Sequence, residues 1–402
     1  LQMKIRKSSV AAAVATVAAG AMLAMSTPAY AATTITVWAD DMVAKSLTTV
    51  LKSYEKANNV KVNVVVKDFG KLRDLFITAS GAGNAPDIMA GAHDWTGKLV
   101  ASGSVAPINL GAAKAQLTAP AVAAFLFQGK NYGVPMATEN IAVLRNVKAA
   151  PTAPKTWAEM VKNGVEIGFD ATGGDPYHFY PLQSSFGAPV FTWNNGWTTT
   201  LGMGGSNGAN FAGWLADQKN NLKAGIGWDD LICNLATGKK AYWITGPWAT
   251  NSIRDGVKGK CDGLGTTGYS IDPFPSAGGY QAKQFLGARG FYLSAKSKNK
   301  VAATKLLTTF LTSQAVQTQI YKDGGRIPAN KLSIKAAGSD KNIAGFAAAG
   351  LTAVPMPNIV AMDSVWDKWG KAEAAIVTGK SKDPEGDWAS MVAAIQKIVD
   401  AG

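Results

Sequence analysis

Acidic side chains and aromatic rings lie near one another at several points along this chain, mostly where a β-strand is expected to end. A carboxylate accepts hydrogen bonds from two neighbouring hydroxyl groups, and each such bond contributes about 1.5–3 kcal/mol when it is desolvated. A flat ring covers the apolar C–H face of a pyranose without requiring a polar partner. The pattern predicts a site for an uncharged sugar, with the candidate ligand-binding residues Asp40, Asp41, Asp94, Trp95, Glu139, Asp175, Tyr177, Trp248 and Trp366.

Each of these residues has a simpler interpretation when it is taken alone. A single tryptophan is more often part of a hydrophobic core, and a single carboxylate is more often a solvated surface charge. The prediction of a sugar site depends on acidic and aromatic residues recurring together along the chain. Asp40 and Asp41 follow Trp38, and Asp94 directly precedes Trp95.

Signatures of catalysis are sparse. His93 and His178 are the only histidines, which disfavours a zinc enzyme, and no P-loop, H-E-x-x-H, EF-hand or C-x-x-C motif occurs. Residues 204–208 match G-x-S-x-G formally, but they lie in a glycine-rich segment, where a chance match is favoured. We therefore expect no catalytic residues, no metal and no cofactor. A glycosidase that uses two of Asp94, Glu139 and Asp175 is the alternative, and it needs carboxyl groups about 5 Å or about 6.5–9.5 Å apart.

The elements expected to hold these residues alternate between strands and helices. Residues 35–38, 60–66 and 86–90 have strand character, and the segments 44–58 and 72–80 between them have helical periodicity. Such alternation is typical of a doubly wound α/β sheet, which binds ligands beyond the carboxyl ends of its strands. Further strands are expected within 131–143, 241–248 and 285–293, a helix over 301–311, and mostly helices after 355.

Length and composition indicate more than one folded unit. The chain has 402 residues, of which 47% are hydrophobic, enough for two or three domains and too many for a disordered chain. Its two cysteines exclude a disulfide scaffold. A bridge between Cys233 and Cys261 is compatible with an exported chain and would contribute about 3 kcal/mol. The alternative is two unpaired buried thiols.

Residues 1–31 are predicted to be a secretory signal peptide. Lys4, Arg6 and Lys7 precede an apolar run, and an A-x-A site ends at Ala31. The apolar run is shorter than the roughly 20 residues that a membrane span requires. No cysteine lies near the cleavage site, so a lipid anchor is not supported. Cleavage would reduce the net charge from +13 to +10. Because the lysines are dispersed, we expect a solvated basic surface and no nucleic-acid partner, with a polyanion binder as the alternative.

Six short motifs occur in an order that resembles one protein family. The sequence is similar to bacterial extracellular solute-binding proteins of the maltose/maltodextrin-binding type, which serve ABC sugar importers. The motifs are APDI with AHD at 85–88 and 92–94, YGVP at 132–135 leading to Glu139, PKTW at 154–157, DPY at 175–177, TGPW at 245–248, and PMPN at 355–358 with Trp366.

The resemblance implies a two-lobe periplasmic-binding-protein-like fold with a hinge and a central ligand cleft. Lobe one would hold 32–138 plus 288–330 and lobe two 142–284 plus 335–402, with hinge crossings near 138–142, 284–288 and 330–335. It implies that sugar hydroxyls bind to Asp94, Glu139 and Asp175, the last replacing the family's usual Glu, and that Tyr177, Trp248 and Trp366 stack on the sugar. Asp40 and Asp41 fall in a first-strand loop that also meets sugar.

Two positions depart from the family pattern. Maltose binders place a tryptophan where Gly91 stands and often an arginine where Trp95 stands. Trp95 would then supply the missing ring from the other side, or the pocket would accept a different sugar.

The function implied by the resemblance is a binding function. The protein would be a monomer in the periplasm or outside the cell at its surface. It would close on maltodextrin-like oligosaccharides and deliver them to the membrane permease subunits of an ABC transporter. The alternatives are a binder of another oligosaccharide and a secreted glycoside hydrolase.

Overall fold

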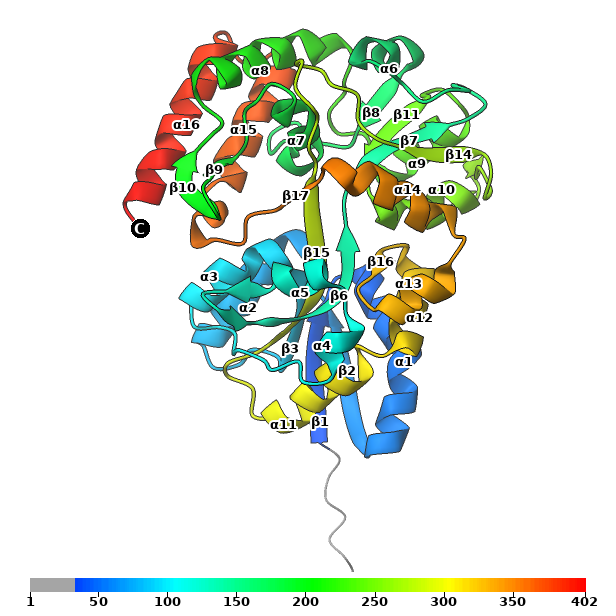
Figure 1. Ribbon diagram of the computed structural model, residues 1–402, viewed down its shortest axis with the longest axis vertical. Helices are drawn as coiled ribbons and strands as arrows, with labels where there is room; N and C mark the ends of the chain where they lie inside the picture. The colour runs from blue at the N-terminus through cyan, green and yellow to red at the C-terminus, as the bar shows by residue number, and fades with distance from the viewer. Residues whose placement is uncertain (1–32) are drawn as a thin grey trace, which may run out of the picture. The chain divides into compact units, whose positions relative to one another are not determined.

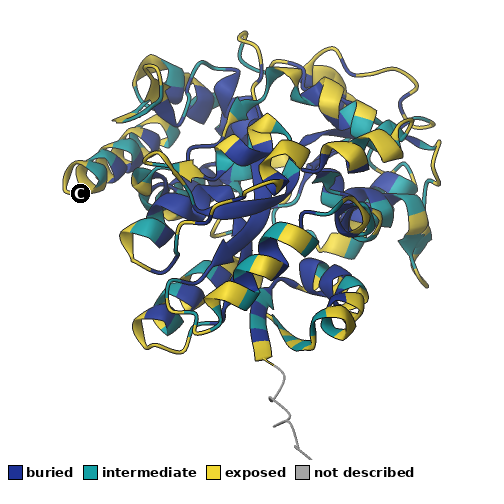
Figure 2. Cartoon of the chain, turned by 60° about the horizontal axis from the view of Figure 1, so that its bottom comes forward, coloured by how far each residue is buried: buried dark blue, intermediate teal, exposed yellow. Residues whose placement is uncertain are grey.

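Two β-sheets with helices on their faces organise residues 33–402, the part of the chain that the computed structural model describes (Figure 1). The predicted signal peptide lies outside the described residues. Each sheet is buried between its helices (Figure 2). The predicted α/β class with two lobes is thus confirmed. None of the helices within residues 33–402 has the length and apolar character that crossing a membrane requires.

The sheet of lobe one has the order β16-β6-β15-β3-β1-β2, and β1 pairs in parallel with β2 and β3. Its strands are β1 Thr33–Ala39, β2 Val60–Val66, β3 Ile88–Ala92, β6 Gly133–Glu139, β15 Phe285–Leu293 and β16 Ile327–Pro328. Its helices are α1 Asp41–Asn58, α2 Phe69–Gly81, α3 Thr96–Ala101, α4 Ala113–Gln116, α5 Ala119–Ala124, α11 Lys300–Lys305, α12 Gln314–Gly324 and α13 Lys331–Ala337.

The sheet of lobe two has the order β14-β7-β11-β8. Its strands are β7 Ala142–Asn146, β8 Val165–Ile167, β11 Tyr242–Thr245 and β14 Tyr269–Asp272, and short hairpins are formed by β9 Phe191–Trp193 with β10 Trp197–Leu201 and by β12 Gly256–Val257 with β13 Cys261–Asp262. Its helices are α6 Trp157–Asn163, α7 Pro176–Ser184, α8 Gly205–Asp217, α9 Trp228–Ala236, α10 Thr250–Asp255, α14 Lys341–Ala349, α15 Trp366–Val377 and α16 Pro384–Asp400.

Alternation along the strands divides each lobe's core into two apolar layers. In β7, Val143 belongs to one buried cluster, and Ala142 and Leu144 belong to the other. In β3, Ile88 and Ala90 pack on one face and Met89 packs on the other. A sheet that is apolar on both faces has to be covered by helices on both sides, which explains the near-continuous hydrophobic runs in the sequence.

The chain passes between the lobes three times. Residues 140–141 join β6 to β7, and residues 273–284 join β14 to β15. The third passage, expected near 330–335, falls instead at 338–340, because α13 packs on α12 and β16 in lobe one whereas α14 packs on β14 in lobe two. Asn330 caps α13 and also donates to Thr312 O, which holds that helix on lobe one. A later strand, β17 Val354–Pro355, returns to pair with β15.

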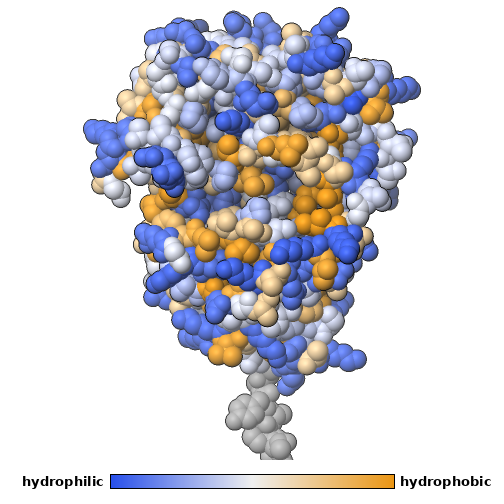
Figure 3. Space-filling model, viewed as in Figure 1, coloured by the Kyte–Doolittle hydropathy of each residue, from blue (hydrophilic) through white to orange (hydrophobic). Residues whose placement is uncertain are grey.

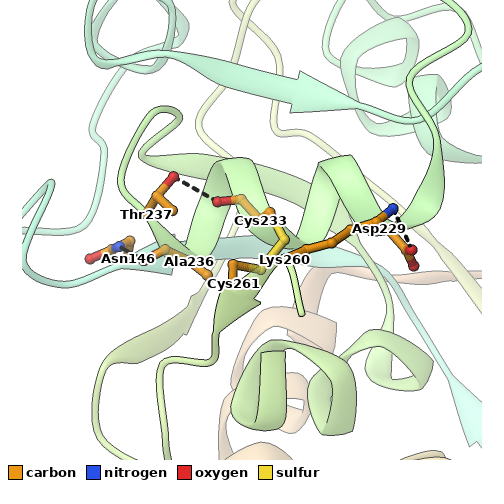
Figure 4. Close-up of a disulfide and its surroundings, with 7 residues drawn as sticks. All are labelled: Asn146, Asp229, Cys233, Ala236, Thr237, Lys260 and Cys261. Carbon is orange, nitrogen blue, oxygen red and sulfur yellow. Dashed lines mark hydrogen bonds and ion pairs between the residues drawn. A yellow bond between two sulfur atoms is a disulfide. The ribbon is translucent and has the colours of Figure 1, made fainter. Parts of the chain in front are cut away.

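A disulfide joins Cys233 in α9 to Cys261 in β13, across a Cα–Cα distance of 5.6 Å (Figure 4). An ion pair between Lys260 and Asp229, 2.8 Å long, lies beside it. The bridge attaches the β12–β13 hairpin to a helix of lobe two.

Candidate ligand-binding site

Three of the predicted carboxylates stand at the carboxyl ends of lobe-one strands. Asp40 directly follows β1, Asp94 lies in the single turn His93–Trp95 that follows β3, and Glu139 is the last residue of β6. These strands lie close together in the sheet, since β3 is next to β1 and only β15 separates β3 from β6. The topology therefore brings the three residues to one edge, as their positions at strand ends predict.

Two arginines that the sequence analysis missed neutralise two of these carboxylates. Arg289 on β15 forms an ion pair with Asp40, and the Nε atom of Arg326 lies 2.7 Å from the Glu139 carboxylate. All four side chains are almost completely buried. Burial would raise the pKa of Asp40, but Arg289, Arg326 and a hydrogen bond from the Val43 N–H outweigh it and hold that pKa below its usual range.

Asp94 differs from these because its carboxylate has no hydrogen bond or ion pair from any other residue within 33–402. The side chain is buried all the same, and burial raises the pKa of Asp94 although His93 and Arg73 oppose the shift. Its two oxygens are therefore able to accept hydrogen bonds from a ligand.

Lobe two contributes aromatic rings to the same region. Tyr177 lies in the first turn of α7, Trp248 in the turn Pro247–Ala249, and Trp366 begins α15. The ring centroids of Tyr177 and Trp248 are 6.3 Å apart, and Phe285 lies 6.1 Å from Tyr177 and 6.3 Å from Trp366. Trp248 packs flat over Gly246, where a Cβ atom would come within 2.2 Å of the indole. Glycine at that position is thus required for the ring's orientation.

Contacts across the lobes bring acidic and aromatic groups into one region. The guanidinium of Arg326 lies 5.5 Å above the Trp248 ring. The Tyr177 hydroxyl is buried without a hydrogen-bond partner within the described chain, and burial, together with the carboxylates of Glu139 and Asp94, raises its pKa well above the usual range. On the face seen in Figure 3, apolar side chains gather along the boundary between the two halves of the molecule.

Asp175 does not offer the free carboxylate that the sequence predicted. One of its oxygens accepts the N–H of His178 at 3.2 Å and caps α7, and the other lies 2.7 Å from Nδ1 of His178. The Asp175 N–H in turn donates to the buried Glu373 at 2.9 Å. Asp175 is therefore committed to its own helix, and its neighbour His178 is the group that it orients.

Two further predicted residues make other contacts. Trp95 is buried against Phe69, 5.0 Å away with nearly parallel rings, and it occupies the space above Gly91. Its ring thus fills the position that a side chain at residue 91 would take. Asp41 is exposed in the first turn of α1, where an acidic residue stabilises the helix N-terminus.

Residues 356–363, which we call the strap, run between the lobes from β17 toward Trp366. His93 donates from Nε2 to Met356 O at 3.1 Å, since its Nδ1 accepts the Ala288 N–H at 3.0 Å. At the other end of the strap, both oxygens of Asp363 bind cations of lobe one, Arg73 at 2.7 Å and Lys98 at 2.9 Å. The strap was predicted as part of lobe two, and Met356 and Met362 do pack in the lobe-two core. Its polar contacts, by contrast, are made to lobe one, so the strap contacts both lobes.

The side chains of this region are groups that can hydrogen-bond or stack on a ligand. Within residues 33–402, no three acidic, histidine or cysteine side chains are grouped so as to hold a metal ion. Two of the three carboxylates considered for a glycosidase are engaged, Glu139 by Arg326 and Asp175 by His178. Ser206 of the G-x-S-x-G match is exposed at the start of α8. What remains is a set of hydrogen-bonding groups and flat rings.

Comparison with known proteins gives a consistent set of similarities. The family described as bacterial extracellular solute-binding protein matches residues 49–348. The chain is 27% identical to the maltodextrin-binding protein MdxE of Bacillus subtilis over 83% of its length and 82% of that protein. It is also 27% identical to a maltooligosaccharide ABC transporter solute-binding lipoprotein of Streptococcus pneumoniae, over 83% of this chain and 81% of the relative.

Two further similarities bear on the ligand and the fold. A galactooligosaccharide-binding protein of Bacillus subtilis is 25% identical over 87% of this chain and 86% of the relative. Among solved structures, a Thermus thermophilus maltotriose-binding protein in complex with maltotriose superposes with a TM-score of 0.79 at 29% identity, covering 91% of this chain and all of that one. The two-lobe architecture is thus also that of a sugar-binding protein.

Proposed function

This chain belongs to the family of bacterial extracellular solute-binding proteins, and from that premise we propose that it is the substrate-binding component of an ABC sugar importer, which binds maltodextrin-like oligosaccharides between its lobes. The observation that carries the proposal is the buried Asp94 side chain, whose carboxylate has no partner within residues 33–402 and lies in the same region as the Tyr177 hydroxyl, which also has none there. Both groups need a hydrogen-bonding ligand, and sugar hydroxyls can donate and accept.

Within this proposal the residues have distinct roles. Asp94 accepts hydrogen bonds from sugar hydroxyls, and Tyr177 and Arg326 donate to them. Trp248 and Trp366 cover the apolar faces of successive sugar rings. Asp40 and Glu139 fix the arginines, so that the donors are oriented before the ligand arrives, which reduces the entropy lost on binding.

Closure follows from the division of these groups between the lobes. A sugar that touches Asp94 on one lobe and Trp248 on the other gains contacts in the closed form that the open form lacks, and this difference shifts the hinge equilibrium. A micromolar site requires about 8 kcal/mol. A few charge-assisted hydrogen bonds and two stacked rings are of the right size to supply it.

We propose further that the protein is exported to the periplasm or the cell surface, acts as a monomer, and docks on the membrane permease subunits of its transporter. Family membership and the lipoprotein relative support the exported location. No hydrolysis of the sugar is expected, because any two of Asp94, Glu139 and Asp175 include at least one carboxylate that is paired with another side chain. Sustained release of shorter sugars from maltotriose by the purified protein would contradict this.

A different oligosaccharide is the second candidate ligand. It is favoured by Gly91 and Trp95, which depart from the pattern of maltose binders, and by the similarity to a galactooligosaccharide-binding protein. A thermal-shift screen over malto-, galacto- and xylo-oligosaccharides distinguishes the candidates, because a ligand that binds only the native state raises the melting temperature. Stabilisation by galactooligosaccharides alone would overturn the maltodextrin assignment, and no stabilisation by any sugar would overturn the function.

A further inference from the structure

The two histidines of the chain have contrasting surroundings. Both ring nitrogens of His93 are engaged, with Nδ1 accepting the Ala288 N–H at 3.0 Å and Nε2 donating to Met356 O at 3.1 Å. His178 uses only Nδ1, which lies 2.7 Å from Asp175, and its Nε2 has no hydrogen-bond partner within residues 33–402. The sequence analysis assigned no role to His178.

The free nitrogen lies among the rings of the proposed sugar site. The His178 ring stands nearly perpendicular to Trp248, with centroids 5.9 Å apart, and to Tyr177, with centroids 5.4 Å apart. Its side chain keeps 16% of its surface exposed, so that a ligand can reach it from solvent. A nitrogen placed beside a flat ring is suited to bind a hydroxyl at the edge of a sugar that stacks on that ring.

Asp175 determines which proton the imidazole carries. Its carboxylate only accepts hydrogen bonds, so Nδ1 must donate, and the neutral ring then has its lone pair on Nε2. The second Asp175 oxygen accepts the His178 N–H, and Glu373 on α15 accepts the Asp175 N–H. The imidazole is thus held by its own helix and, through Asp175, by a second helix of lobe two.

We propose that His178 is a further sugar-binding residue, whose Nε2 accepts a hydroxyl of the saccharide that stacks on Trp248, and that Asp175 is its positioning residue. This inference depends on the proposed function. It moves the polar contact predicted for Asp175 to His178, three residues later in the first turn of α7, whose side chain is longer than that of Asp175.

Three substitutions separate the roles of shape, hydrogen bonding and positioning. His178→Phe keeps a planar ring and removes the nitrogen, and it should weaken maltotriose binding about tenfold, the effect of roughly 1.4 kcal/mol. His178→Gln keeps a polar side chain and should recover part of that loss. Asp175→Asn preserves the helix cap, because asparagine caps as well as aspartate, but it holds the imidazole less firmly and should also weaken binding.

The most direct test observes the nitrogen itself. Because the chain has only two histidines, a long-range ¹H–¹⁵N imidazole spectrum of the full protein contains two ring systems, and His178→Phe assigns them. Saturating maltotriose should shift Nε2 of His178 and change its exchange, and the signals of His93, whose nitrogens are already engaged, should move much less. The binding measurement itself uses the wild-type protein, and the variant serves only to assign the two ring systems.

The outcomes separate this inference from the proposed function. If tryptophan fluorescence reports maltotriose binding while Nε2 of His178 is unmoved, or while His178→Phe binds as tightly as wild type, this inference is wrong and the proposed function stands. If neither maltotriose nor any other oligosaccharide of the screen binds the wild-type protein, both are wrong.

Discussion

Replacing Asp94 by asparagine is expected to weaken sugar binding and to stabilise the empty protein. Asparagine retains one acceptor oxygen and exchanges the other for a donor, so at least one charge-assisted bond is lost, worth about 1.5–3 kcal/mol. Since 1.4 kcal/mol corresponds to a factor of ten, the dissociation constant for maltotriose should rise roughly 10- to 150-fold.

The same substitution should raise the stability of the empty protein, because the pKa of Asp94 is raised by burial. A carboxyl whose pKa is higher in the folded than in the unfolded chain takes up protons on folding. Its contribution to stability therefore declines as the pH rises above its unfolded value of about 4. Asparagine does not ionise and removes this cost. The unliganded variant should melt above wild type at pH 7, and the difference should shrink toward pH 4.

Asp87 provides a matched control at the other end of the same strand. It is as buried as Asp94, but its carboxylate accepts the Thr36 N–H at 2.9 Å and the Ser297 hydroxyl at 2.6 Å. Asp87→Asn should therefore lower the melting temperature and leave sugar affinity nearly unchanged. Calorimetric titration with maltotriose measures the affinity of each variant, and thermal melts at the two ends of the pH range given above measure its stability. An Asp94→Asn protein that binds maltotriose within about twofold of wild type, or that is less stable than wild type at pH 7, would refute the reasoning.

Three further predictions, made with five substitutions, test neighbouring parts of the structure. Trp248→Ala and Trp366→Ala should each weaken maltotriose binding about tenfold, if each stacked ring contributes about 1.4 kcal/mol; unchanged calorimetric affinity in both would argue against these platforms. Asp363→Asn removes the anchor of the strap and should weaken binding roughly threefold, given that the pairs are partly screened by solvent. Asp367→Asn, whose ion pair with a lysine one turn later is exposed, should not weaken binding, and equal effects of the two would deny the strap a role. Cys233→Ser should lower the free energy of unfolding in urea by about 3 kcal/mol with sugar affinity preserved, and a large loss of affinity in the folded protein would show that the bridge supports the site.

The sequence predicted the site best where local pattern determines position. The alternation of strands and helices over residues 33–92 places Asp40 and Asp94 at the ends of parallel strands, and the structure puts both there. Strand ends in a doubly wound sheet meet at one edge, so no knowledge of distant contacts was needed.

The arginine partners were not predictable from local pattern. Arg289 pairs with a residue 249 positions away and Arg326 with one 187 positions away, because β15 and β16 return late in the chain to lie beside strands formed early. Charge alone gives no signal for such pairs in a chain with many dispersed cations. The role of Asp175, by contrast, was readable, since an aspartate before a proline is a typical start of a helix and leaves its carboxylate bound to the backbone.

The balance of charge in the site bears on the kind of ligand that it binds. Each arginine in the site faces a carboxylate, Arg289 with Asp40 and Arg326 with Glu139, and these pairs are buried. The cationic excess of the sequence therefore lies elsewhere, on lysines that are mostly exposed within residues 33–402. A polyanion would find no free cations in this site, whereas a neutral sugar would find donors and acceptors already oriented. It follows that raising the salt concentration should hardly change affinity for sugar, although it would reduce the affinity of a polyanion steeply.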